Sequence, residues 1–185
     1  MERSTPMWSI FGGVQLSRTW CKCCGHARKL YEPMSILLFG LPATGETSLT
    51  TLLKEYTSPE HIPGATCDFC SMSGGLTKQL HIARWPRNVV IGLKWWTWLP
   101  QGFGVKPKVT VAFPPVWSPQ HAEDYRLTGI VLHSGDVGGG HNTACVADED
   151  RWFLYDDAAS PKLLLAQCVL DTKPYILLYH RLGRA

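Results

Sequence analysis

Two Cys-x-x-Cys pairs constrain the fold of this sequence more than any other feature. Cys21 and Cys24 form the first pair, and Cys67 and Cys70 form the second, some forty residues later. Two residues between thiols let one tight turn direct both sulfurs at a tetrahedral zinc ion, at Zn–S distances of about 2.3 Å. Two such turns complete a site of four thiolates, so the sequence predicts a structural zinc site that joins two distant segments.

The cysteine pairs have two other interpretations: reduced cysteines that have lost a metal, and redox-active dithiols. Cys23 is an alternative ligand, and His26 is a substitute for a missing thiolate. A catalytic metal is not expected, because four thiolates leave no coordination position for water. The odd total of seven cysteines, and their clustering, favour metal binding in a reducing compartment over a disulfide framework. We therefore expect a cytoplasmic or nuclear protein.

The composition indicates one globular domain without a strongly charged partner. The 185 residues are 45% hydrophobic, which is enough for a core, and the net charge is only +3. Basic residues are scattered, so we expect no nucleic-acid partner. No apolar run approaches the roughly 20 residues that span a bilayer, and the N-terminus lacks the long apolar core of a secretory signal. A membrane partner is not expected either.

The pattern of elements predicts an α+β fold with many antiparallel strands. A helix is expected over 45–56, with Thr47 or Ser48 as its N-terminal cap. From residue 125 onward the chain reads as strand, glycine loop, strand, tight turn and strand, followed by a short irregular or helical piece. Further strands are expected within 8–20, 31–42, 76–86, 88–98, 108–113 and 174–181.

A histidine and two aspartates flank a predicted hairpin within residues 138–158, GGGHNTACVADEDRWFLYDDA. With a three-residue loop at 148–150, His141 falls opposite Asp157, and a loop changed by one residue brings Asp156 opposite instead. In either register the Cβ atoms of histidine and aspartate lie about 5 Å apart on adjacent strands. The carboxylate can then fix the imidazole tautomer and leave the other ring nitrogen free to act as a base.

The alternative interpretation of this segment is a structural histidine–carboxylate pair at a sheet edge. The glycine run before the histidine, Gly138 to Gly140, leaves room for another backbone to pass close to it. Spacing alone does not separate a catalytic pair from a structural one.

Taken in order, these segments resemble the ubiquitin-specific proteases, the papain-like cysteine deubiquitinases. The family's two zinc knuckles match FGGVQLSRTWCKCCG and CDFC, and its intervening helix matches TSLTTLLKEY. Its palm strands match TKQLHIARWPRNVVIGLKWW, and its histidine box and closing strands match YRLTGIVLHSGDVGGGHNTACV, RWFLYDD and PYILLYHR. No single motif is decisive, but so many in the same order are specific.

The resemblance implies a palm sheet, over about 99–185, and a zinc-bearing fingers extension, over about 8–98, that grips ubiquitin. It also implies catalytic roles. His141 would be the general base and Asp156 its orienting partner, with Asp157 as the reserve candidate. The residues that would line the channel for ubiquitin's Gly-Gly tail are His133, Gly139 and Gly140.

This sequence departs from the family pattern at three places. Asn142 stands where the family has tyrosine, and Trp95 and Trp96 replace its Arg-Phe pair. The Gly-Asn-Thr-Cys-Tyr-like box that carries the family's nucleophile on a thumb lobe is absent. Cys145 cannot substitute, because four strand residues from His141 amount to about 13 Å, and no turn or helix start activates Cys168.

We therefore expect residues 1–185 to be a partial catalytic domain without its thumb. It would supply the histidine and aspartate of a thiol hydrolase that cleaves ubiquitin's C-terminal isopeptide or peptide bond. The cysteine would come from a missing N-terminal segment or from a separate chain, and this chain alone would be inactive. The alternative is a catalytically inactive module that binds ubiquitin or ubiquitinated proteins as a scaffold.

Overall fold

The computed structural model describes residues 5–98, 104–136 and 139–183. Internal contacts group the chain into two compact units. The cysteine unit comprises Met1–Ser35 and Leu53–Pro86, and the sheet unit comprises Ile36–Leu52 and Arg87–Ala185. Each unit is described by itself. No helix in the described part of the chain is both long and apolar enough to cross a membrane.

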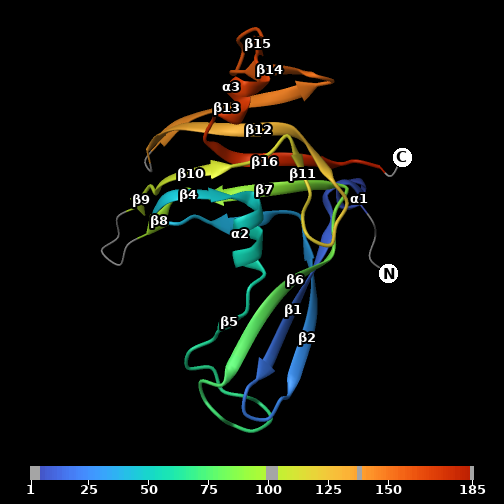
Figure 1. Ribbon diagram of the computed structural model, residues 1–185, viewed down its shortest axis with the longest axis vertical. Coiled ribbons are helices and arrows are strands. Elements are labelled where there is room, and N and C mark those ends of the chain that lie inside the picture. Colours follow the sequence, from blue (N-terminus) through green and yellow to red (C-terminus); the bar gives the residue numbers. More distant parts are fainter. Residues whose placement is uncertain (1–4, 99–103, 137–138, 184–185) are drawn as a thin grey trace. The chain divides into compact units, whose positions relative to one another are not determined.

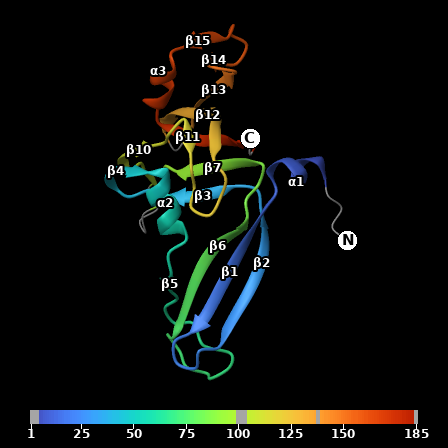
Figure 2. The same cartoon turned by 45° about the vertical axis from the view of Figure 1, so that its right-hand side comes forward.

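The cysteine unit is built on a four-stranded antiparallel sheet, whose long strands β1, β2 and β6 lie side by side (Figures 1 and 2). In spatial order the strands are β2 (Ala27–Met34), β1 (Gly13–Cys21), β6 (Leu76–Arg84) and β5 (Glu60–His61). The β1–β6 ladder ends with Cys21 opposite Leu76. The turn after β1 and the loop before β6 therefore meet at one end of the sheet.

The expected strand over 8–20 is wrong at its start. Pro6–Phe11 form a short helix, α1, and the strand begins only at Gly13. The Thr5 hydroxyl accepts a hydrogen bond from the Trp8 amide, and Pro6 occupies the first turn, where its missing N–H costs nothing. A capping residue followed by proline is a helix start that the apolar pattern alone does not reveal.

The sheet unit is organised around an eight-stranded sheet, which Figure 1 shows in colours from green to red, except for β3, which is blue. Its order is β15 (Lys162–Leu164), β14 (Arg151–Tyr155), β13 (Gly139–Asp148), β12 (Tyr125–Asp136), β16 (Pro174–Arg181), β7 (Asn88–Lys94) and β3 (Leu37–Gly40), with β11 (Val116–Trp117) also paired to β12. Within this sheet only the β3–β7 pair is parallel among the described strands. The expected α+β class with mostly antiparallel strands is therefore confirmed.

The sheet unit also contains two smaller ribbons and two helices. The remaining elements are β4 (Thr44–Ser48) parallel to β10 (Lys108–Ala112), β8 (Thr97–Trp98) paired with β9 (Gly104–Val105), α3 (Ala166–Leu170) and the start of α2 (Leu49–Tyr56). The expected division at residue 98 differs from this grouping, because β3 and β7 pair within the large sheet.

The helix expected over 45–56 begins later than predicted, at Leu49. Residues 44–48 are strand β4 instead, because they pair with β10, a contact that is not visible in the local sequence. Of the two expected caps, Ser48 is the one in position: its hydroxyl accepts a hydrogen bond from the Thr51 amide at 3.2 Å.

One face of the large sheet forms the core of the sheet unit. Directly paired residues share a face, so one row runs across the strands through Leu37, Ile91, Leu177, Ile130 and Cys145, all buried. The side chains of Leu49, Val109, Val111, Phe113, Trp117 and Val169 are buried in the same unit. Alternation along each strand sends the next residue to the opposite face.

We predict that Leu177→Ala lowers the free energy of unfolding by about 2–5 kcal/mol, because the substitution leaves a cavity in the middle of the sheet, where Leu177 is 0% exposed. The matched control is Leu163→Ala on edge strand β15, where leucine is 66% exposed and the expected change is within about 0.5 kcal/mol. Urea unfolding followed by circular dichroism measures both. Equal losses for the two variants would contradict the assignment of the core.

Candidate functional site

The four predicted cysteine ligands form one cluster in the cysteine unit. The Cys21 and Cys70 sulfurs are 3.7 Å apart, the Cys24 and Cys67 sulfurs are 3.8 Å apart, and all four lie within 4.8 Å of one another. A tetrahedron with metal–sulfur bonds of about 2.3 Å has sulfur–sulfur edges of about 3.8 Å. The cluster therefore has the dimensions of a site that could hold a metal ion.

The two cysteine turns have the same backbone hydrogen bonds. The amides of Cys21 and Cys67 each donate to the carbonyl five residues later, at 2.9 Å, and the carbonyls of Cys21 and Cys67 accept from Gly25 and Ser71. Gly25 and Ser71 both have positive φ, at 72° and 59°. The left-handed residue closes each turn so that its two thiols point to the same side.

Cys23 and His26, the alternative ligands, lie outside the cluster. Cys23 is exposed, and the His26 ring stacks on Phe69 with centroids 5.0 Å apart.

The electrostatics of the cluster favour a bound cation. Backbone amides of Cys24 and Cys23 donate hydrogen bonds that lower the pKa of the Cys21 thiol to about 7. The pKa of Cys70 rises to about 12: the Met72 backbone hydrogen bond lowers it, but desolvation and the three neighbouring thiols outweigh that effect. Crowded thiolates repel one another, and a cation in their centre would relieve the repulsion.

The second group of predicted residues lies at one end of the large sheet, on β13 and just after β14. The expected hairpin register is wrong by one residue: Asp148 pairs with Arg151 across a two-residue turn, rather than Ala147 with Arg151. The left-handed conformation of Glu149, at φ 56°, makes the tighter turn possible. The ladder ends at Tyr155, so neither aspartate is directly opposite His141 in the sheet.

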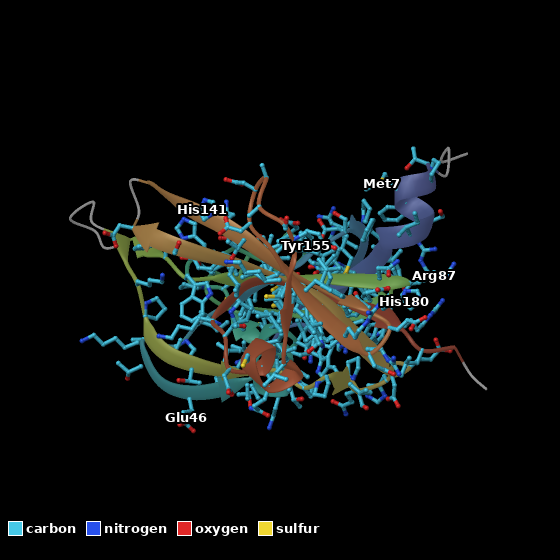
Figure 3. All side chains as sticks on the ribbon, turned by 90° about the horizontal axis from the view of Figure 1, so that it is seen from above. Met7, Glu46, Arg87, His141, Tyr155 and His180 are labelled. Carbon is cyan, nitrogen blue, oxygen red and sulfur yellow. The ribbon has the colours of Figure 1, made fainter. Side chains whose placement is uncertain are left out.

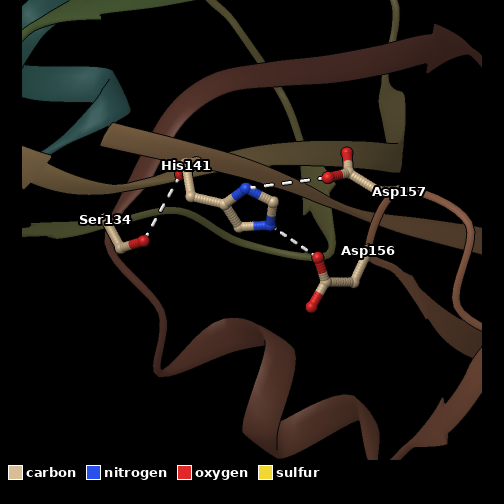
Figure 4. A network of polar contacts seen from close by, with 4 residues as sticks. All are labelled: Ser134, His141, Asp156 and Asp157. Carbon is tan, nitrogen blue, oxygen red and sulfur yellow. Dashed lines mark hydrogen bonds and ion pairs between the residues drawn. The ribbon is translucent and has the colours of Figure 1, made fainter. Parts of the chain in front are cut away.

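Asp156 nevertheless contacts the histidine, because the chain bends as it leaves β14. His141 Nε2 and Asp156 Oδ1 are 2.5 Å apart, and His141 Nδ1 and Asp157 Oδ2 are 3.9 Å apart (Figure 4). The first distance is a hydrogen bond and the second is too long for one. Asp157 adopts a left-handed conformation, φ 45°, which directs the two carboxylates to different ring nitrogens.

The backbone of the histidine is hydrogen-bonded to the neighbouring strand β12, and its side chain is 47% exposed. The Ser134 hydroxyl on β12 donates a long hydrogen bond to the His141 carbonyl at 3.4 Å. His141 lies at the opposite end of the sheet from His180 (Figure 3). The hydrogen bond with Asp156 raises the pKa of His141, and the charges of Asp156 and Asp157 raise it further.

The residues expected to line a tail channel lie beside this pair. His133 on β12 is opposite Asn142 on β13, and its ring abuts Gly140, where a side chain would collide with it. Gly139 has open space around it. Gly138 lies outside the described residues. Tyr175 also belongs to this region, because its ring centroid is 4.8 Å from that of His133, but no local sequence pattern connects the two residues.

No cysteine thiol forms a hydrogen bond with His141 in the described part of the chain. Cys145 on β13 is 1% exposed, and burial raises its pKa. Both features oppose a nucleophilic role for Cys145. Cys168 is exposed on α3, without a hydrogen bond to the histidine.

Comparison with known proteins agrees with this architecture. A family model described as ubiquitin carboxyl-terminal hydrolase matches residues 1–179, so the fold is that of this class of hydrolases. The chain belongs to the ubiquitin carboxyl-terminal hydrolase family, and the resemblance to ubiquitin-specific proteases is confirmed.

Individual relatives extend beyond this chain. Ubiquitin carboxyl-terminal hydrolase 4 of Eremothecium gossypii is 28% identical over 94% of this chain, which spans 23% of that protein. Human ubiquitin carboxyl-terminal hydrolase 3 is 27% identical over 95% of this chain, which spans 39% of it. A structure of the SAGA Ubp8/Sgf11/Sus1/Sgf73 DUB module bound to ubiquitin aldehyde matches the fold with TM-score 0.85 and 22% identity, over 98% of this chain and 44% of that one.

We predict that Asp156→Asn lowers the pKa of His141, because it removes the charged acceptor at Nε2. Asp157→Asn is the matched control and should lower it less, because its carboxylate is 3.9 Å from Nδ1. Since the pKa is raised in the folded protein, the pair stabilises the fold below the unfolded pKa, and the stabilisation is lost as pH rises through the folded pKa. Titration of the histidine ring protons by NMR measures both variants. A larger effect of Asp157→Asn would assign the orienting role to Asp157.

Proposed function

We propose that this chain is the C-terminal catalytic portion of a deubiquitinase. It supplies the base and the orienting acid of a thiol hydrolase that cleaves the isopeptide or peptide bond at the C-terminus of ubiquitin. The nucleophilic cysteine comes from a segment outside these 185 residues, in the same polypeptide or in a separate chain. The observation that carries the proposal is the hydrogen bond between His141 Nε2 and Asp156, which leaves Nδ1 without a hydrogen-bonded carboxylate.

That geometry is suited to general-base catalysis by a histidine. Asp156 holds the tautomer in which Nε2 carries the proton and Nδ1 is the base. Nδ1 takes the proton of the cysteine thiol, and the thiolate attacks the carbonyl carbon of ubiquitin's last residue. The imidazolium then gives this proton to the leaving lysine amine, and an acyl-enzyme remains. Water, deprotonated by the same histidine, releases ubiquitin and restores the thiol.

The exposed face of the large sheet supports the idea that a further segment completes the protein. Leu38 and Tyr155 lie in one row of paired residues and Val146 and Leu163 in the next, all on the face opposite the core. All four side chains are more than a third exposed. We assign this face to the cysteine-bearing segment, because the relatives' chains are two to four times longer than this one.

We assign the two units to different tasks in the same reaction. The sheet unit is the palm that carries His141, Asp156 and the tail-lining His133, Gly139 and Gly140. The cysteine unit is the fingers extension that holds the body of ubiquitin. The structural relative bound to ubiquitin aldehyde supports ubiquitin as the partner. All seven cysteines are unpaired, which supports a cytoplasmic or nuclear location.

Zinc is the metal that best fits the cysteine cluster. Four sulfur ligands in a tetrahedron of this size suit Zn²⁺, and a closed four-thiolate site serves structure rather than catalysis. Cys21, Cys24, Cys67 and Cys70 would hold the ion and tie the two turns together.

We predict about one zinc ion per purified chain, and a lower thermal midpoint after chelation, because the metal would link two turns that are far apart in the sequence. Cys67→Ser should lose the zinc. Cys23→Ser is the matched control, because this cysteine is in the first turn but outside the cluster, and it should retain the metal. Elemental analysis and thermal unfolding measure the outcome. Equal zinc loss in both variants would exclude the proposed ligand set.

We predict that the chain alone binds ubiquitin but does not hydrolyse a ubiquitin–fluorophore substrate, because no thiol among the described residues is hydrogen-bonded to His141. Calorimetry measures the binding, and fluorescence release measures the turnover. Turnover that disappears with His141→Ala would show that a nucleophile lies within the chain.

A complementation experiment separates the enzyme from the scaffold alternative. The cysteine-bearing segment of a relative is fused before Met1, with its Cys→Ser form as control. Turnover that depends on both that cysteine and His141 supports the enzyme. Ubiquitin binding without turnover, in a fusion that folds, favours the inactive scaffold.

A further inference from the structure

His141, Asp156 and Asp157 form a second group of metal-ligating atoms, in addition to the four cysteines. One such atom from each residue lies within 4.8 Å of the other two. All three residues belong to the sheet unit, whereas the four clustered cysteines belong to the cysteine unit. We call these three residues the histidine group, and it is a candidate metal site of its own.

The two carboxylates of the histidine group lie at different nitrogens of the ring. Asp156 Oδ1 is hydrogen-bonded to Nε2 at 2.5 Å, and Asp157 Oδ2 is 3.9 Å from Nδ1 (Figure 4). The hydrogen bond keeps the proton on Nε2, so the lone pair of Nδ1 is available on the side of Asp157. A histidine that binds a metal through one nitrogen almost always donates from the other to a carboxylate, carbonyl or water, which orients the ring. Asp156 is in that supporting position.

The gap between Nδ1 and Asp157 is close to the size that zinc requires. Bonds of about 2.0 Å to nitrogen and about 2.1 Å to oxygen place the two ligand atoms about 3.4 Å apart at a tetrahedral centre. The Asp157 carboxylate therefore has to approach Nδ1 by about 0.5 Å. Its side chain is 82% exposed, so this movement disturbs no core packing, and the exposed ring leaves the other coordination positions open to water.

The charge of the histidine group also favours a divalent cation. Asp156 and Asp157 form no ion pair with a lysine or arginine among the described residues, and their one ionic partner there is His141. Two carboxylates beside a single imidazole have an excess of negative charge in either protonation state of the ring. A bound divalent cation would balance this excess.

We infer that the histidine group binds one Zn²⁺ ion, with His141 Nδ1 and Asp157 as its ligands, water in its other positions, and Asp156 as the supporting acceptor at Nε2. Zinc accepts a mixture of imidazole and carboxylate ligands, whereas Mg²⁺ and Ca²⁺ prefer sites made of oxygen alone. Two protein ligands hold an ion more weakly than four thiolates do. This zinc therefore binds and dissociates as the zinc concentration changes.

Zinc in the histidine group would inhibit the proposed hydrolase. If the proposed function is correct, on which this step rests, Nδ1 is the atom that takes the proton of the cysteine thiol. A lone pair that is bonded to zinc cannot accept this proton. The thiolate would be a further zinc ligand, so zinc should bind more tightly to the completed enzyme than to this chain alone.

The test of binding follows the two ring nitrogens of His141 in the full chain by proton–nitrogen correlation NMR. One equivalent of Zn²⁺ is added first, to fill the cysteine cluster. We expect further Zn²⁺ to shift the Nδ1 signal strongly while Nε2 keeps the signal of an N–H donor. Mg²⁺ at the same concentration should shift neither nitrogen.

Three aspartate variants test the ligand assignment. Asp156→Asn should weaken zinc binding about ten- to a hundred-fold, the range expected for the loss of an outer hydrogen-bond partner. Asp157→Asn should weaken it by about ten-fold or more, because a direct ligand contributes at least as much. Asp136→Asn is the matched control: this exposed aspartate on β12 lies at the same end of the sheet but outside the group, and its loss should leave the affinity nearly unchanged. Thermal unfolding checks that each variant is folded.

The test of inhibition uses the fusion with the cysteine-bearing segment of a relative. Added Zn²⁺ should stop turnover of the ubiquitin–fluorophore substrate, and a chelator that is too weak to empty the cysteine cluster should restore it. Asp157→Asn should raise the zinc concentration for half-inhibition by about the factor that it shows in binding.

An Nδ1 signal that does not respond to millimolar Zn²⁺ would overturn the inference, and this measurement needs no variant to fold. A zinc shift at Nε2 instead, or equal weakening by Asp157→Asn and Asp136→Asn, would overturn it as well. The proposed function fails separately: if the folded fusion has no turnover while zinc binds at Nδ1, the zinc site is correct and the hydrolase is wrong. If the fusion turns over and Nδ1 does not respond to zinc, only the zinc site is wrong.

Discussion

The antiparallel ladder between β12 and β13 is the interaction on which the candidate site depends. It places His141 opposite Ser134 and Asn142 opposite His133, so the imidazole and the residues beside it keep fixed positions. The next ladder, to β14, ends at Tyr155, and the chain then bends to bring Asp156 to the ring. A shift of one residue in the first ladder would turn the histidine to the other face of the sheet.

The cysteine unit relies on a different constraint. Its two turns share the same hydrogen bonds and left-handed closing residues, so each directs its thiols before any metal binds. The raised pKa of Cys70 reflects the repulsion that four close sulfurs would experience without a cation. Binding of a metal by the four sulfurs would therefore be coupled to the folding of this end of the unit.

The sheet unit holds the residues that we propose as one half of a thiol hydrolase's chemistry. It holds a histidine with a hydrogen-bonded carboxylate, whereas its two cysteines are either buried or without a hydrogen bond to the histidine. The same unit has an exposed apolar face. It also has two buried polar atoms without a hydrogen bond among the described residues, His133 Nδ1 and the Tyr175 hydroxyl. Each of these features is explained if further polypeptide, from the enzyme and from its substrate, contacts the sheet.

The sequence by itself determined the features that depend on local spacing: the two pairs of clustered cysteines, most strands, and the pairing of His141 with an aspartate just after the next strand. It did not determine α1, the hairpin register, or which aspartate contacts the ring, because a two-residue turn and a bend after Tyr155 decide them. Only the tertiary structure brought Lys106 to Trp95, Trp96 and Tyr175. In the sequence, two tryptophans replace the Arg-Phe pair of the family. Which other rings they lie beside depends on pairing between strands that are distant in the sequence.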